Sequence, residues 1–303
     1  MRELIIIGAG PAGITTSIYA ARKRMNFLVI TKDIGGQAAL SSDIENYTGY
    51  QYITGAELTK KFEQHVREFQ IELKYEEVLE IEKVKEGFIV KTDKGAYESK
   101  TLVIASGAVP KKLNVPGEIE FKNRGVTYCA TCDAPLFSNK DVAVIGGGNL
   151  GLDATLQLTK IANKIYLIGR GEKLKGDEVM CENVERSDKV TVLTNTKVLE
   201  ITGDKFVASV KVERGGKQET LEVQGVFIEI GYIPNSKFIA GMVKLNERNE
   251  IVIDDYCQTN VEGIFAAGDV TNVPYKQIIL AGGEGSKAAL GVYGYLQKLK
   301  KRS

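Results

Sequence analysis

The 303-residue sequence is poor in the residues that build metal sites and disulfide scaffolds, with one histidine and four cysteines. So few cysteines suit a protein kept in a reducing cytoplasm rather than a secreted disulfide scaffold. A structural zinc site needs four ligands, and neither a second C-x-x-C pair nor a pair of histidines accompanies Cys129 and Cys132. We therefore expect no metal. His65 lies among charged residues and is expected on the surface without a catalytic role.

An excess of charge and low-complexity tracts are also absent. The 40 basic residues are balanced by 39 acidic ones, giving a net charge of +1, which argues against nucleic acid or an anionic membrane as the main partner. Residues 4–21 carry no charge, but Gly8, Gly10, Pro11 and Gly13 interrupt them too early for a signal peptide or a membrane-spanning helix. We expect a soluble, cytoplasmic protein.

The first informative motif is a glycine loop close to the N-terminus. Residues 4–7 are apolar and predict a buried parallel strand, and residues 14–24 predict a helix. Between them stands the pattern G-x-G-x-x-G, which in this context predicts a dinucleotide site. Gly8 would make the turn, Gly10 would let a pyrophosphate approach the backbone, and Gly13 would allow close packing of helix on strand.

The rest of the first half predicts further strands and one helix. Residues 27–31 predict the second strand, although the acid usually found at the end of such a strand is missing. A helix is expected over 55–69, a β-hairpin over 86–99 and a buried strand over 102–105. The prolines and glycines of 109–117 predict a crossing between domains.

The same succession of elements begins again in the second half. It consists of a strand over 142–145, a glycine loop over 146–151, a helix over 150–161, a strand over 164–168, a hairpin about 215–216 and a strand over 226–230. Two such loops are a stronger signal than one. We interpret them as an internal duplication of a whole nucleotide-binding domain, a far longer unit than a solenoid repeat.

The last segment returns to the pattern of the first domain. Residues 261–270 predict a strand that ends in Gly268 and Asp269, and an amphipathic helix over 283–300 closes the chain. Asp269 can accept a hydrogen bond from a sugar hydroxyl, or it can be only a turn residue. The expected fold class is α/β, with two Rossmann-like three-layer nucleotide-binding domains, the second inserted in the first.

A pair of cysteines lies between the two glycine loops. Cys129 and Cys132 are followed at once by Asp133. Thiols at this spacing can close a small disulfide or ligate a metal. Cys181 and Cys257 stand alone and are interpreted as buried small residues.

Taken together, these motifs resemble the low-molecular-weight thioredoxin reductases over nearly the whole chain. The order of the matching segments is more specific than any one of them, and they are Gly8–Gly13, Gly35–Gln37, Glu45-Asn46, Ala105–Gly107, Cys129–Asp133, Gly146–Gly151 and Ala266–Val270. Residues 275–278 are closer to the flavoprotein of alkyl hydroperoxide reductase, where lysine is usual at the place of Lys276. That relative has an N-terminal disulfide domain, which this sequence lacks, so the resemblance implies a separate thiol protein as acceptor.

The resemblance implies FAD in a domain of residues 1–112 and 244–303, NAD(P)H in a domain of residues 113–243, and a homodimer. The FAD contacts that it implies are Gly8, Gly10, Pro11, Ala12, Gly13, Gly36, Gln37, Asn46, Val78, Ala105, Gly107, Gly268, Asp269, Lys276, Gln277 and Ile278. The implied contacts to the pyridine nucleotide are Gly146, Gly148, Asn149, Leu150, Gly151, Arg170 and Lys175.

The preference between NADPH and NADH depends on residues 169–175. NADPH-dependent members carry several arginines there, whereas this chain has Arg170 with Lys173 and Lys175. The acid that would favour NADH is missing at Gly169. Positive charge without that acid modestly favours NADPH, while NADH or the use of both stays open.

The resemblance also implies a path for the electrons, from NAD(P)H through FAD and the cysteine pair to thioredoxin or a glutaredoxin-like protein. Cys132 would face the flavin, Cys129 would attack the substrate, and Asp133 would be the acid–base group, unless it only caps a helix. Since the thiols and the nucleotide share one domain, we expect the domains to rotate, with hinges near 115–117 and 244–246.

Two other functions stay open. An NAD(P)H oxidase, or the electron donor of a peroxide-reducing system, is suggested by the segment around Lys276. A non-catalytic flavin- or redox-sensing protein belongs to a different class, and the intact cysteine pair argues against it.

Overall fold

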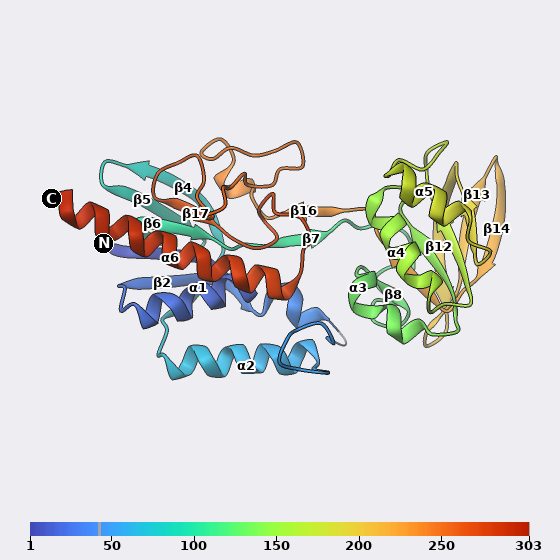
Figure 1. Ribbon diagram of the computed structural model, residues 1–303, viewed down its shortest axis with the longest axis horizontal. Coiled ribbons are helices and arrows are strands. Elements are labelled where there is room, and N and C mark those ends of the chain that lie inside the picture. The colour runs from blue at the N-terminus through green and yellow to red at the C-terminus, as the bar shows by residue number, and fades with distance from the viewer. Residues whose placement is uncertain (42–43, 303) are drawn as a thin grey trace. The chain divides into compact units, whose positions relative to one another are not determined.

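The computed structural model describes residues 1–41 and 44–302. It divides into two compact units, of which unit 1 comprises Met1–Val109 and Ile233–Ser303 and unit 2 comprises Pro110–Tyr232 (Figure 1). One α/β unit is therefore inserted in the other, and the predicted fold class is confirmed.

Both boundaries of the inserted unit differ from the predicted residues 113 and 243. The chain crosses at Val109 and returns at Ile233, within strands β7 (Ala108–Pro110) and β16 (Tyr232–Pro234), which pair with each other. Residues 233–243 belong to unit 1 because Ile239 and Val243 are buried in its core. Their hydrophobic burial is not visible as a pattern in so short an irregular segment.

The expected hinge positions also lie inside the units rather than at the crossings. A Cβ at Gly117 would lie 1.8 Å from the carbonyl oxygen of Ile201, and the carbonyl of Pro116 accepts a hydrogen bond from the Ile201 amide. Residues 244–246 pair with 250–252 within unit 1. Both segments are thus packed within their own units, and the position of the hinges stays a prediction.

A largely parallel sheet organises unit 1. Its strand order is β3-β2-β1-β6-β5-β4, and β17 also pairs with β6. The strands are β1 (Arg2–Ala9), β2 (Phe27–Ile34), β3 (Leu73–Tyr75), β4 (Val78–Val84), β5 (Gly87–Thr92), β6 (Ala96–Ile104) and β17 (Ile264–Ala266). The helices are α1 (Pro11–Arg22), α2 (Gly55–Glu68) and α6 (Ile278–Arg302), with short 3-10 turns η1 (Gly36–Leu40) and η3 (Lys237–Ile239). The hairpin predicted over 86–99 is confirmed as β5–β6.

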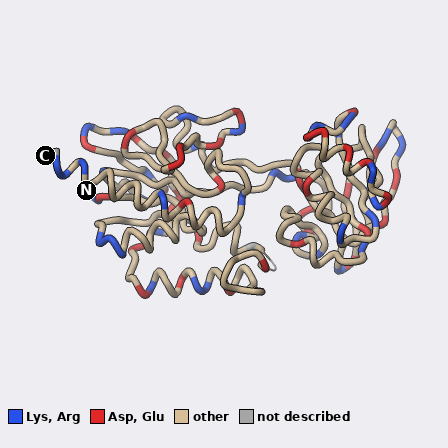
Figure 2. Tube along the Cα trace, viewed as in Figure 1, with Lys and Arg blue, Asp and Glu red and all other residues tan. Residues whose placement is uncertain are grey.

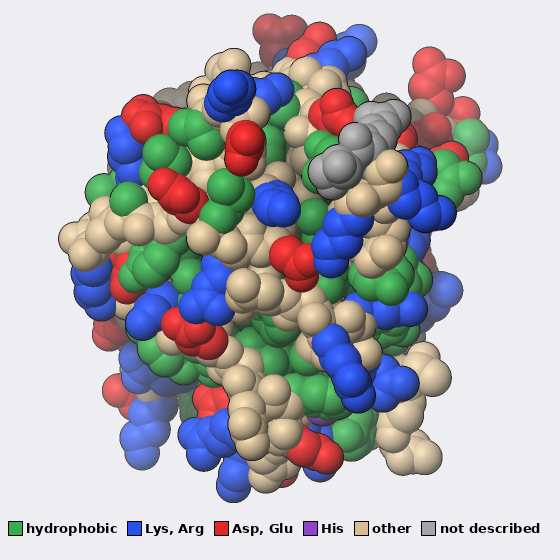
Figure 3. All heavy atoms as spheres, turned by 90° about the vertical axis from the view of Figure 1, so that its left-hand side faces the viewer, with side chains coloured by type: hydrophobic (Ala, Val, Ile, Leu, Met, Phe, Trp, Pro, Cys, Tyr) green, Lys and Arg blue, Asp and Glu red, His purple; other side chains and the backbone are tan. Residues whose placement is uncertain are grey.

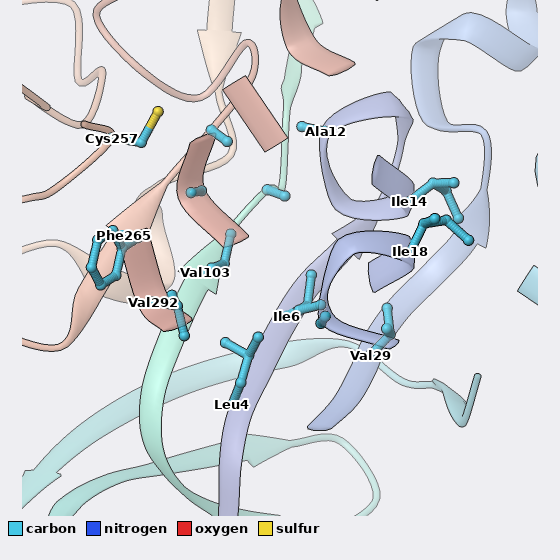
Figure 4. Close-up of a cluster of buried hydrophobic side chains, with 14 of the residues drawn as sticks. Leu4, Ile6, Ala12, Ile14, Ile18, Val29, Val103, Cys257, Phe265 and Val292 are labelled. Carbon is cyan, nitrogen blue, oxygen red and sulfur yellow. The ribbon is translucent and has the colours of Figure 1, made fainter. Parts of the chain in front are cut away.

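The apolar run of β1 is continuous because both of its faces are buried. Leu4 and Ile6 pack with α1 and α6 in one core cluster, as Figure 4 shows, whereas Ile5 and Ile7 pack in a second cluster on the other face. Side chains alternate across a strand, so a strand covered on both faces must be apolar throughout.

Helix α6 begins at Ile278, five residues before the predicted start at 283. Gly285 allows this helix to pack closely on α1, since a Cβ there would lie 2.2 Å from the carbonyl oxygen of Ala12. The Thr16 hydroxyl donates to the Gly285 carbonyl at 3.0 Å, which holds α1 against α6.

Unit 2 repeats this architecture on a smaller scale. Its parallel sheet has the order β11-β10-β9-β15-β8, formed by β8 (Val126–Thr127), β9 (Asp141–Ile145), β10 (Lys164–Ile168), β11 (Val190–Leu193) and β15 (Gly225–Ile228). An antiparallel sheet contains β12 (Thr196–Gly203), β13 (Val207–Arg214) and β14 (Lys217–Glu222). The helices are α3 (Ala130–Asp133), α4 (Asn149–Thr159) and α5 (Glu178–Glu185), with a 3-10 turn η2 (Ala134–Phe137). In both units the strand before the glycine loop is central, which confirms the predicted duplication.

Charge is spread over both units. Basic and acidic residues follow one another along the trace in Figure 2, and on the face seen in Figure 3 they are interspersed with hydrophobic side chains. None of the helices in the described residues combines the length and the hydrophobicity that a membrane span requires. His65 is exposed on α2, as predicted.

Candidate functional site

The N-terminal glycine loop has the geometry that a dinucleotide requires. Gly8 has φ +105°, and a Cβ there would lie 2.3 Å from the carbonyl oxygen of Ala105. A Cβ at Gly13 would lie 1.8 Å from the Gly8 carbonyl oxygen, so only glycine allows α1 to start this close to β1. At Gly10, by contrast, a Cβ would meet no described atom within 4 Å.

Gly10 is the N-cap of α1, and Pro11 and Ala12 open the helix. Among the described residues, no side chain caps this end by a hydrogen bond, and the first turn contains no acid. The amide groups of its first turn therefore have no capping side chain among the described residues. Such amides bind the phosphates of a nucleotide.

Other predicted contacts of FAD gather around this loop. A Cβ at Gly36 would lie 3.4 Å from the Gly10 Cα, and one at Gly268 would lie 3.0 Å from the Ala12 Cβ. Gln37 follows in η1, while Ala105 and Gly107 follow β6. The Asn46 amide donates to the side chain of Gln277 at 3.1 Å, which joins two segments that are 231 residues apart.

Asp269 provides an acceptor beside this loop. Burial raises the pKa of its carboxyl, and the nearby Lys276 opposes that shift. A partly buried carboxylate at the end of a strand suits a ribose hydroxyl, since a hydrogen-bond donor there would compensate for the lost water. With the open Gly10 backbone, this chemistry fits FAD in unit 1.

Three of the predicted FAD contacts also pack against other parts of unit 1, and they are Lys276, Val78 and Ile278. The Lys276 ammonium donates to the carbonyls of Thr271 and Val273 at 2.5 and 2.9 Å and pairs with Glu250 at 3.1 Å. It therefore fixes the loop after Asp269. Val78 and Ile278 are partly buried against separate hydrophobic clusters of unit 1.

The second glycine loop, in unit 2, copies the first. A Cβ at Gly151 would lie 1.8 Å from the Gly146 carbonyl oxygen, while a Cβ at Gly148 would meet no described atom within 4 Å. Gly148 is the N-cap of α4, where none of the described side chains forms a capping hydrogen bond. Asn149 accepts a hydrogen bond from the Asp177 amide at 2.8 Å, and Leu150 is exposed. The loop fits a second dinucleotide.

The basic segment 169–175 lies against this second loop. A Cβ at Gly147 would be 3.5 Å from the Gly169 Cα, and the Lys175 amide donates to the Gly147 carbonyl at 2.7 Å. Arg170, Lys173 and Lys175 are exposed. Their charges are thus available next to the loop for a phosphate of the nucleotide.

The cysteine pair forms a disulfide at the start of α3. The Cα atoms of Cys129 and Cys132 are 5.3 Å apart, and the Cys132 amide donates to the Cys129 Sγ at 3.2 Å. Both residues are partly exposed. Strand β8 leads into the pair, and the hydroxyl of Tyr232 donates to the Tyr128 carbonyl at 3.1 Å. The ambiguity between disulfide and metal is therefore resolved in favour of a disulfide.

Asp133 is held close to the pair. Its amide donates to the Cys129 carbonyl at 3.1 Å, and the Thr127 hydroxyl donates to its carboxylate. Asp133 stands at the N-cap of the 3-10 turn η2, but its side chain forms no capping hydrogen bond there, and α3 begins earlier with Cys129 at its N-cap. The carboxylate is instead part of the turn that carries the disulfide.

Two buried glutamates near the pair were missed from the sequence. Glu118 is 1% exposed and accepts from the amides of Leu113 and Asn114 and from the Tyr128 hydroxyl. Glu229 accepts from the Ala130 amide at 2.9 Å. The signal for Glu229 was an acid within the apolar strand 226–230.

The free cysteines differ in burial. Cys257 is buried, as predicted, and its thiol donates to the Glu284 carbonyl, whereas Cys181 is only partly buried. Within residues 1–41 and 44–302, no group of three or more His, Cys, Asp or Glu side chains is arranged to hold a metal ion.

Comparison with solved structures gives close likenesses. The thioredoxin reductase of Streptococcus pyogenes MGAS5005 is 36% identical with a TM-score of 0.91, over 98% of this chain and 99% of that chain. The thioredoxin reductase of Giardia duodenalis is 31% identical with a TM-score of 0.90. The match with Giardia covers 98% of this chain and 99% of the other.

Curated relatives have other names. An NADH dehydrogenase of Bacillus subtilis (strain 168) is 41% identical over 97% of this chain. This chain spans only 58% of that relative's length. The Pyridine nucleotide-disulphide oxidoreductase family matches residues 2–292. The chain therefore belongs to this family, whose thioredoxin reductase members use FAD and a pyridine nucleotide, and it has their fold.

Proposed function

We propose that the protein is an FAD-dependent thioredoxin-disulfide reductase, which transfers electrons from NAD(P)H to the Cys129–Cys132 disulfide and then to thioredoxin or a glutaredoxin-like protein. The observation that carries this proposal is the closed disulfide on α3, in the same unit as the second glycine loop. The likeness to thioredoxin reductases along the whole chain supports it. Oxidation of NAD(P)H that requires a thioredoxin disulfide is the test.

The residues divide between two cofactor sites. FAD would be held in unit 1 by the loop Gly8–Gly13 with Gly36, Gln37, Asn46 and Asp269, and the nucleotide in unit 2 by Gly146–Gly151. When bound, the two groups supply a hydride donor and a hydride acceptor. We also propose that the units rotate about β7 and β16 during turnover, because the disulfide and the nucleotide loop both belong to unit 2.

The cysteines perform the exchange with the protein substrate. Two electrons and two protons convert the disulfide to two thiols. The Cys129 thiolate then attacks the substrate disulfide and forms a mixed disulfide, while one substrate sulfur leaves as a thiolate. Cys132 attacks the Cys129 sulfur, which restores the disulfide and releases the substrate as a dithiol. Asp133 would supply the proton to a leaving thiolate.

Replacing Asp133 tests this proton transfer. We expect Asp133→Asn to lower kcat for thioredoxin reduction by about 10²-fold, because an amide cannot deliver a proton. Flavin reduction by NAD(P)H should be unchanged. Glu118→Gln is the control, since it alters another carboxylate close to the pair. Stopped-flow absorbance measures both steps, and an unchanged kcat would remove Asp133 from the mechanism.

The choice of nucleotide depends on the exposed basic residues near the second loop. We propose NADPH as the preferred donor and expect Arg170→Ala with Lys175→Ala to raise KM for NADPH about tenfold, because the 2′-phosphate loses its cations. KM for NADH should change less than twofold. Lys160→Ala, at the opposite end of α4, is the control. Steady-state kinetics with both nucleotides measure the effect, and an equal rise for both would contradict the proposal.

A second candidate function is electron donor of a peroxide-reducing system, or NAD(P)H oxidase. It is favoured by a relative from Xanthomonas campestris pv. phaseoli that is named as part of an alkyl hydroperoxide reductase. The two are 41% identical over 97% of this chain and 57% of the relative's own length. Oxygen consumption that survives replacement of both Cys129 and Cys132 would favour the oxidase.

We further propose a cytoplasmic homodimer. The two free cysteines agree with a reducing compartment. Light scattering of the purified protein measures the oligomeric state.

A further inference from the structure

Glu229 contacts both the second glycine loop and the C-x-x-C turn of unit 2. It follows β15, and its amide donates to the carbonyl of Ile145 at 2.8 Å, directly before the second glycine loop. Its own carbonyl oxygen would lie 2.2 Å from a Cβ at Gly146. Its side chain accepts a hydrogen bond from the Ala130 amide, inside the C-x-x-C turn, at 2.9 Å.

This carboxyl is in unusual surroundings for an acid. Glu229 is 7% exposed, and the charges that act on it are those of Asp133 on α3 and Asp153 on α4. Both are acids, and Gln157 of α4 also donates to Asp153. Burial, with these two carboxylates, raises the pKa of Glu229 to about 8, although the Ala130 amide opposes the shift.

We propose that Glu229 is a positioning residue for the cysteine pair, whose carboxyl fixes the first turn of α3 and whose charge controls how readily a thiol ionises. The neutral acid can hold the Ala130 amide without placing a negative charge beside a developing thiolate. The ionised acid would repel that thiolate, since the amide that it holds belongs to the residue next to Cys129. The ionisation of the thiols would thus depend on whether Glu229 is protonated.

The first test is the ionisation of the thiols in the full-length protein after reduction by dithiothreitol, which is itself oxidised to its cyclic disulfide. Alkylation of Cys129 by iodoacetamide, followed by mass spectrometry, reports the thiolate. We expect Glu229→Gln to react about 3- to 10-fold faster than the wild type at pH 9, and within twofold of it at pH 6.5. Profiles that superpose over the whole pH range would overturn the role of the charge.

The second test is the position of α3. Glutamine keeps an acceptor for the Ala130 amide, whereas alanine leaves a buried amide without one. At pH 6.5, where the wild-type acid is neutral, we expect Glu229→Ala to lower the equilibrium constant for closing the disulfide against dithiothreitol by about tenfold. Glu229→Gln should restore it to within about threefold. Equal constants for Glu229→Ala and the wild type would contradict a positioning role.

A matched control is available in unit 1. Glu284 is also a buried glutamate that accepts from a backbone amide, that of Gly268 at 2.7 Å. Glu284→Gln should leave both the alkylation profile and the disulfide equilibrium unchanged, which separates a local effect from general destabilisation. The inference rests on the redox role of the pair in the proposed function. Its readouts need neither nucleotide nor thioredoxin, so it can fail while that function stands.

The pH dependence of stability gives an independent measurement. A buried acid with a raised pKa stabilises the folded state fully below its unfolded value, near 4.5, and this contribution is lost as the pH rises through about 8. The Glu229→Gln variant has no acid at this position, so its stability does not fall for this reason as the pH rises. We expect its melting temperature to rise relative to that of the wild type between pH 5 and 8, and a constant difference would contradict a buried ionisation.

Discussion

Replacing Cys132 by serine is expected to abolish reduction of thioredoxin, by at least about 10³-fold in kcat, while NAD(P)H still reduces the flavin. The serine hydroxyl cannot form a disulfide, so neither the uptake of two electrons nor the closing attack on the Cys129 sulfur can occur. Anaerobic absorbance measurements of the flavin, followed by a thioredoxin turnover assay, check both halves of this result.

The matched control is Cys181→Ser. Cys181 is a free cysteine of the same unit and takes no part in the disulfide. This variant should keep full activity. Loss of flavin reduction in Cys132→Ser would mean that the pair holds the nucleotide or the fold rather than accepting electrons, and the proposed sequence of steps would be wrong.

Two glycine substitutions in the first loop should distinguish an effect on folding from an effect on cofactor binding. Gly13→Ala places a methyl 1.8 Å from the Gly8 carbonyl oxygen, so α1 must move away from β1. We expect a loss of roughly 3 kcal/mol or more in the unfolding free energy, as for other overpacked buried sites. Chemical denaturation of the apoprotein measures it.

Gly10→Ala is the matched partner of that variant. A Cβ at Gly10 meets no described atom within 4 Å, so the stability of the apoprotein should change by less than about 1 kcal/mol. The methyl would nevertheless occupy the space that a pyrophosphate needs, and we expect FAD affinity to fall about 100-fold. Equal FAD binding by Gly10→Ala and the wild type would remove the first loop from the FAD site.

Much of this fold could be predicted because its signals are local. A glycine between an apolar strand and a helix commonly marks a tight turn that needs φ above zero and leaves no room for a Cβ. Gly8 and Gly146, in the two loops, have both features. The duplication was visible for the same reason. The apolar run of β1 predicted a strand buried on both faces.

The errors arose where a residue's role depends on distant parts of the chain. The prediction missed the first five residues of α6, of which Gly282 lies against α1, where a Cβ would be 3.4 Å from the Thr15 hydroxyl oxygen. Residues 233–243 carry no periodic pattern, and their membership of unit 1 follows from the burial of Ile239 and Val243 and from the hydrogen bond of Ser236 to the Asn249 carbonyl. Glu229 lies in a strand pattern that gives no hint of Ala130, 99 residues away.

The most direct test of the central proposal follows one sample through both half-reactions. The protein loaded with FAD is reduced without oxygen by two equivalents of NADPH or NADH, one for the disulfide and one for the flavin, and oxidised thioredoxin is then added. Bleaching of the flavin band by the nucleotide, recovery on addition of thioredoxin, and loss of that recovery in Cys132→Ser are the predicted results. A flavin that stays reduced with thioredoxin and is reoxidised only by oxygen would contradict a disulfide reductase.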